Sequence, residues 1–240
     1  ASLLVDYILT VAVSVSAGVS ALTSAFPSLD PHRVLFASLV IVFVAYVNLI
    51  GVKESGLFFA VPTYGFVISI LSLVALGGYR VASGDPYAME DSSVRVIPEF
   101  NQFTGFAAVW LFARAYAAGC TALTGIEAVA DGVPAFKKSE SKNASRVLIW
   151  MAAILGSSFF GLSILAQHIK PLADEEGHIS QTVLAQMAEH VYGGRNIFFF
   201  VTQFATFGIL ILAANTAYAD FPRLSSIIAK DNYMPRQFMN

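Results

Sequence analysis

Four polar side chains follow one another along the apolar segment DYILTVAVSVSAG near the start of the chain. At about 100° per helical residue and with Asp6 as zero, Thr10 falls at about 40°, Ser14 at about 80° and Tyr7 at about 100°. A carboxylate and three hydroxyls therefore share one helix face, which rises about 12 Å from Asp6 to Ser14. Oxygen ligands of this hard type suit a bare alkali cation. We expect this face to line a cation path.

The same residues also have simpler interpretations. Ser14 and Gly18 form a small-xxx-small pair that lets two helices approach closely, and the Thr10 hydroxyl can donate to a carbonyl one turn earlier. Asp6 can lie at the membrane interface, where tyrosines such as Tyr7 are common. A carboxylate inside a membrane span is costly unless it faces a cavity or a partner, which favours a functional interpretation of Asp6.

A second candidate region is AYAAGCTALTGIEAVADGVPAFKK, in which Gly119 and Gly125 bracket a polar stretch. Such glycines predict a broken helix, and broken helices expose backbone carbonyls to the substrate in many secondary transporters. Thr124 and Glu127 share a face at this break and, with Thr121, are candidate substrate-binding residues. The alternative is a glycine-kinked helix that packs closely against a neighbour, with Glu127 hydrogen-bonded for structural reasons.

The composition of the chain indicates the elements that position these residues. Of 240 residues, 56% are hydrophobic and 12% are charged, and the mean hydropathy is +0.67. About 20 apolar residues make one bilayer-spanning helix. The sequence predicts an all-α membrane protein with six transmembrane helices, at Leu3–Ala25, Val34–Ile50, Leu57–Gly78, Gly105–Val129, Val147–Ile169 and Ile197–Ala219. Polar contacts between helices are the expected role of Gln203, Thr206, Asn215 and Thr216 in the last span.

Charge and motif content argue against several classes of function. A net charge of −2 and a pI near 6.1 give no basic field, so nucleic acid is not an expected partner. One cysteine excludes a disulfide framework. No histidine lies in the central part of a predicted span, no nucleophile–base set is visible, and no repeated filter sequence is present. We therefore expect a carrier without a cofactor, rather than an enzyme or a channel.

The connections between the predicted spans indicate orientation. Lys and Arg are more frequent after the second, fourth and sixth spans, as in the cluster Lys137, Lys138 and Lys142. These connections are predicted to be cytoplasmic, so both ends of the chain would face the cytoplasm. On the opposite side, Val183, Met187 and Val191 recur every four residues in SQTVLAQMAEHVYG. This spacing predicts a short helix, either interfacial or, as we favour, an ordinary amphipathic loop helix.

The two polar segments resemble one superfamily, the amino acid–polyamine–organocation superfamily. The likeness is greatest to KUP-type potassium uptake permeases of the bacterial KimA branch. DYILTVAVSVSAG is similar to the third span of that branch, ALTGIEAVADGVPAFK to its broken sixth span, and NLIGVKESG to the connection after its fourth. The segment VPAFKKSESKNASRVL also resembles amino-acid permeases of the wider superfamily, so it does not decide the substrate.

The resemblance implies the five-plus-five inverted-repeat (LeuT-like) transporter fold, with this chain covering the third to eighth spans. Residues 1–240 would then be one transmembrane transporter domain, truncated at both ends and located in the plasma membrane. The family carries potassium ions by symport with protons, and a homodimer is implied. Potassium ligands carried over by position are Asp6, Thr10, Thr124 and Glu127. The family's first span is absent, so an amino-acid or amine permease of the same fold stays the alternative.

Overall fold

The computed structural model describes residues 2–50, 56–84, 105–120, 139–171 and 181–239, and these residues are mostly helical with no strand among them. They divide into two compact units, residues 1–89 with 165–240 (unit 1) and residues 90–164 (unit 2). The α-helices are α1 (Ser2–Ala25), α2 (Arg33–Ile50), α3 (Gly56–Ala82), α4 (Phe106–Cys120), α6 (Glu140–Ile169), α7 (Val183–Tyr192) and α8 (Ile197–Lys230). Two short 3₁₀ helices are η1 (Pro27–His32) and η5 (Arg236–Met239).

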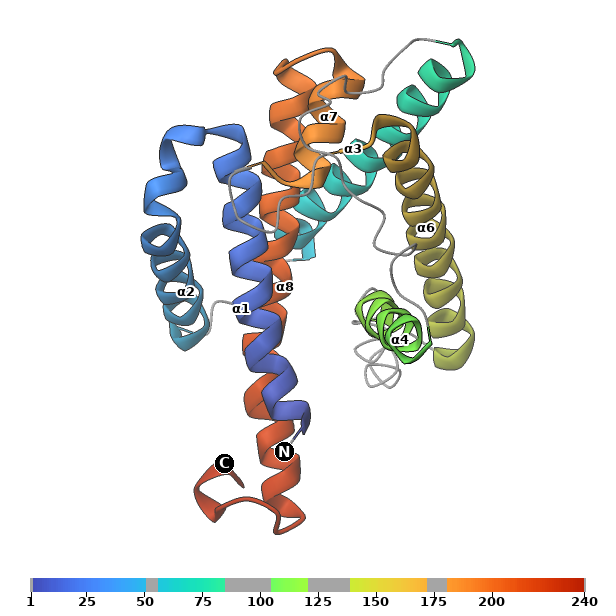
Figure 1. Cartoon of the computed structure of the whole chain (residues 1–240). Helices are drawn as coiled ribbons and strands as arrows, with labels where there is room; N and C mark the ends of the chain where they lie inside the picture. The colour runs from blue at the N-terminus through green and yellow to red at the C-terminus, as the bar shows by residue number, and fades with distance from the viewer. Residues whose placement is uncertain (1, 51–55, 85–104, 121–138, 172–180, 240) are drawn as a thin grey trace. The chain divides into compact units, whose positions relative to one another are not determined.

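Unit 1 is built around the pair of α1 and α8, which run side by side in opposite directions (Figure 1). Helices α2 and α3 each contact α8, and α7 packs against α3 and α8. The centre of the α1–α8 contact is apolar, with Val15, Val19 and Ala214 almost completely buried. Side chains of α2 complete this cluster. We call the end of unit 1 that carries α7 the α7 end.

Local sequence signals set the limits of these helices. The Asn196 side chain accepts hydrogen bonds from the backbone N–H groups of Phe198 and Phe199 and so caps the start of α8. Thr182 caps α7 in the same way, and Gly193 ends that helix in the left-handed conformation, with φ 75°. Pro62 lies inside α3, where its Cβ would be 3.1 Å from a Cβ placed on Gly208.

Five of the six predicted spans are confirmed as helices long and apolar enough to cross a membrane. The fourth is described only as α4, whose apolar part is Phe106–Ala117, and the rest of that predicted span lies outside the described residues. Three helices are clearly longer than predicted: α3 continues to Ala82, α6 begins at Glu140 and α8 continues to Lys230. Charged residues lower the hydropathy of these ends without disfavouring helix, because Glu, Lys and Arg are good helix formers.

The short helix predicted between the last two spans is confirmed as α7. Met187 and Val191, two of the three periodic residues, are buried against the rest of unit 1, whereas Val183 is exposed. This packing agrees with an ordinary amphipathic loop helix. Unit 2 contains α4 and most of α6, and the side chains of α6 are largely exposed in it.

Candidate functional site

The first predicted polar face lies on α1, and its residues become more buried along the helix. Asp6 is exposed, Thr10 is half-buried, and Ser14 is buried with 9% of its surface accessible. The face therefore passes from the open flank of α1 toward the contact with α8. A cation that followed it would meet a carboxylate first and hydroxyl oxygens deeper in the protein.

The close approach of α1 to α8 requires a small residue at position 18, which is a glycine in this chain. A Cβ placed on this glycine would lie 3.5 Å from side-chain atoms of Phe207, Leu210 and Ile211, all on α8. These are ordinary van der Waals distances, so an alanine fits and a larger side chain does not. The small-xxx-small interpretation of Ser14 and Gly18 is thus confirmed for the glycine, and it brings the polar face of α1 beside α8.

Tyr7 lines a cavity between α1, α2 and α8. The cavity has a volume of about 380 Å³. Its lining is mostly apolar and consists of Tyr7, Ile8, Val11, Ala12, Ile41, Ala217, Tyr218, Phe221 and Pro222. Tyr7 is half-buried and stands at the boundary between this cavity and the polar face that begins at Asp6.

The polar residues of α8 differ in their hydrogen-bond partners. Asn215 confirms the expected contact between helices, because its Oδ1 accepts a hydrogen bond of 2.8 Å from Asn48 Nδ2 on α2. The Thr206 and Thr216 hydroxyls make local contacts, since each donates to a carbonyl one turn earlier in α8. The expectation was wrong for Gln203, whose amide is buried and makes no hydrogen bond to any described residue.

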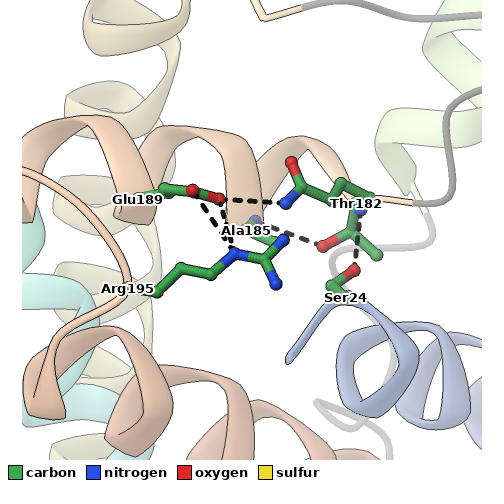
Figure 2. A network of polar contacts seen from close by, with 6 residues as sticks. Ser24, Thr182, Ala185, Glu189 and Arg195 are labelled. Atoms are coloured by element: carbon green, nitrogen blue, oxygen red, sulfur yellow. Dashed lines mark hydrogen bonds and ion pairs between the residues drawn. The ribbon is translucent and has the colours of Figure 1, made fainter. Parts of the chain in front are cut away.

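A polar network joins α7 to the ends of α1 and α8 (Figure 2). The backbone N–H of Thr182 donates to the Ser24 hydroxyl on α1 at 2.9 Å. On α7, Glu189 accepts from Gln181 Nε2 at 2.9 Å and forms an ion pair of 3.3 Å with Arg195, just before α8. This network fastens α7 to the two helices that carry most of the buried polar residues.

Sequence reasoning missed this network, although one signal for it was present. Thr182 stands directly before an amphipathic run, as a helix-capping residue does. The partners of Ser24 and Glu189 are distant in sequence or depend on the position of α7 in the fold, so no spacing rule identifies them.

The second predicted region lies mostly outside the described residues. Thr121, Thr124, Gly125 and Glu127 are in that part of the chain, and the predicted break with them. Gly119 is helical in the last turn of α4. Within the described ranges, no three His, Cys, Asp or Glu side chains are grouped as a metal site would require.

Comparison with known proteins adds two findings. A family model described as amino acid permease matches residues 1–240. The potassium transporter KimA of Bacillus subtilis (strain 168) is 41% identical over 241 aligned residues, which cover 99% of this chain. The chain spans 37% of the length of that relative.

Proposed function

The chain belongs to the amino acid permease family, and from that premise we propose that it acts, as part of a multi-pass membrane transporter, in the import of potassium ions. The observation that carries this proposal is the polar face of α1, which leads from an exposed carboxylate at Asp6 to a buried hydroxyl at Ser14 beside α8. The relative KimA is named a potassium transporter, and this supports potassium as the transported ion.

In this proposal the α1 face supplies one side of the ion path. Asp6 attracts and binds the cation when it is ionised, and Tyr7, Thr10 and Ser14 offer hydroxyl oxygens in place of water. Thr124 and Glu127 supply the opposite side at a helix break, as the resemblance implies. The inverted-repeat fold and alternating access belong to the proposal, and so does a plasma-membrane location with both chain ends in the cytoplasm.

Proton coupling follows from the chemistry of a carboxylate in a site that excludes water. Desolvation favours the protonated form and a bound cation favours the ionised form, so the two ligands oppose each other at one group. We assign this role to Glu127, with protons as the coupling ion and no further cofactor. An inward proton gradient is then expected to accelerate uptake in vesicles that contain the wild-type protein, and the Glu127→Gln variant is expected to lose this acceleration.

Rubidium uptake by the full-length protein in proteoliposomes tests the proposed cargo. Asp6→Asn and Glu127→Gln are each expected to lower uptake at least about tenfold, which corresponds to about 1.4 kcal/mol. Asp30→Asn in η1 is the matched control, because Asp30 follows the end of α1 opposite to Asp6, and this variant should transport normally. Wild-type uptake retained in both Asp6→Asn and Glu127→Gln would overturn the proposal.

A second candidate function is an amino-acid or amine permease of the same fold, which the description of the matching family favours. The same vesicles distinguish the two functions. A potassium transporter takes up rubidium with saturation in the absence of any amino acid, and unlabelled potassium competes. Uptake of labelled amino acids or amines without saturable rubidium uptake would favour the second candidate. Linear, unsaturable rubidium flux would indicate a channel.

A further inference from the structure

Gln203 is a polar residue of unit 1 that is buried without a described hydrogen-bond partner. Its side chain is 1% exposed, and both Nε2 and Oε1 are buried without a hydrogen-bond partner among the described residues. It lies on α8 near the α7 end, opposite the last two turns of α1. Two contacts on either side of Gln203 show this position along α1. The Phe26 ring lies 5.7 Å from the Phe200 ring, and Gly18 lies beside Phe207.

Other buried polar residues gather at the same end of unit 1. Thr23 and Ser24 on α1, Ser69 on α3, and Thr202 and Thr206 on α8 are each at most 9% exposed. The middle of the α1–α8 contact has instead the apolar cluster around Val15. The amide of Gln203 thus stands in a polar part of the interior, where a polar molecule can be held.

Four of these hydroxyls, those of the threonines and of Ser24, already donate their proton to a backbone carbonyl. Thr202 donates to the Phe198 carbonyl at 2.9 Å, and Thr206 donates to the Thr202 carbonyl at 2.7 Å. On α1, both Thr23 and Ser24 donate to the Ser20 carbonyl. These hydroxyls can accept further hydrogen bonds. They have no proton left for Oε1 of Gln203.

We infer that the amide of Gln203 binds a buried water molecule between α8 and the last turns of α1. The occupant must donate to Oε1 and accept from Nε2, and its second proton needs an acceptor, which the threonine hydroxyls of α8 provide. Water meets all three requirements and is the smallest molecule that does so. A bare alkali cation would satisfy Oε1 but would repel the amide N–H groups. This site does not depend on the proposed cargo.

A high-resolution map of the full-length protein in lipid nanodiscs tests the inference directly. A peak within hydrogen-bond distance of both Gln203 Oε1 and Nε2 is expected in the wild type, and it should disappear in Gln203→Met. Gln186→Met on α7 is the matched control, because the buried Gln186 amide already donates to the Gln181 carbonyl. The peak should remain in that variant. A direct contact between the Gln203 amide and another residue of the full chain would overturn the inference.

Ion replacement and X-ray footprinting give independent readouts. When rubidium or thallium replaces potassium, the peak should keep the scattering of an oxygen, and a gain would identify a cation and overturn the water assignment. Radicals formed from a bound water should oxidise the buried Phe199 ring, one turn from Gln203, and the yield should fall several-fold in Gln203→Met. Val15, equally buried in the apolar cluster, serves as the internal control. Equal yields at Phe199 in both proteins would also contradict the inference.

Discussion

Helices α1 and α2 are neighbours in the chain and in space, yet very different shares of their residues are buried. In the most apolar stretch of each helix, 44% of the residues are buried in α1 but only 6% are buried in α2. Helix α2 is also the more apolar of the two, with a mean hydropathy of 2.2 against 1.7 for α1. The more apolar helix is therefore the more exposed one. In a bilayer this is expected, because lipid chains are as apolar as leucine and helix contacts depend instead on close packing and polar groups.

The contrast shows where function can be sought in a protein of this class. The exposed residues of α2, such as Val42 and Leu49, need only an apolar surrounding. Helix α1 combines small residues that allow contact with α8 and polar residues that a lipid-facing helix would not tolerate. The cation path proposed here follows the helix with the lower apolar content and the greater burial.

The largest effect is expected from enlarging Gly18. Gly18→Leu places extra carbons where α8 already lies at 3.5 Å, and overpacking of this kind costs about 3 kcal/mol or more. The full-length variant should lose most of its folded yield and its rubidium uptake. Gly18→Ala should retain both, because the added Cβ meets its neighbours at ordinary contact distance. Thermal melting in detergent measures the difference, and equal melting temperatures for the two variants would contradict the packing described for α1.

Substitution of one serine in each helix tests whether α1, rather than α2, contributes to the ion path. Ser14 on α1 is buried beside α8, whereas Ser38 on α2 is exposed and donates to the Val34 carbonyl at 2.9 Å. Ser14→Ala should lower the apparent rubidium affinity about tenfold, or about 1.4 kcal/mol, because one oxygen of the path is removed. Ser38→Ala should transport as the wild type does. Concentration-dependent uptake at matched protein amounts measures both, and an unchanged affinity in Ser14→Ala would remove that residue from the proposed path.

Two valines compare the helices as packing surfaces. Val19 on α1 is 2% exposed, and Val42 on α2 is 65% exposed. Val19→Ala leaves a cavity inside the protein and is expected to cost about 1 kcal/mol. Val42→Ala leaves a space that lipid or detergent can fill, so its effect should stay within about 0.5 kcal/mol. Unfolding in mixed micelles measures both changes. A larger loss for Val42→Ala would mean that α2 is covered in the full protein.

Much of the fold was predictable, because apolar runs determine which segments form helices. The structure places α1 and α2 within a residue or two of the predicted spans. The ends of α6 and α8 were not predictable from hydropathy, since residues such as Glu140 and Lys230 are polar but helix-compatible. The length of a helix beyond its apolar part depends on caps and tertiary contacts, which a hydropathy count does not include.

The candidate site was predictable in its periodicity but not in its surroundings. Helical spacing correctly placed Asp6, Thr10 and Ser14 along one side of α1, but it gave no information on how α1 is rotated relative to α8. That rotation sets the graded burial of this face and brings Tyr7 to the apolar cavity. The sequence also could not predict that the Gln203 amide lacks a described partner, because the hydrogen bonds of a buried side chain depend on its neighbours in three dimensions.

The smallest expected effect concerns the polar bond between Asn48 and Asn215, which links the exposed α2 to α8. Because Asn215 makes a further interaction, the single change Asn215→Ala removes more than this bond. A double-mutant cycle with Asn48→Ala isolates the pair, and hydrogen bonds between membrane helices average about 0.6 kcal/mol in such cycles. Unfolding in mixed micelles gives the four free energies, and a cycle of Ser38→Ala with Asn215→Ala is the control, with no coupling expected. A coupling near zero for the asparagine pair would mean that packing alone, through the cluster around Val15, holds the exposed helix against the buried one.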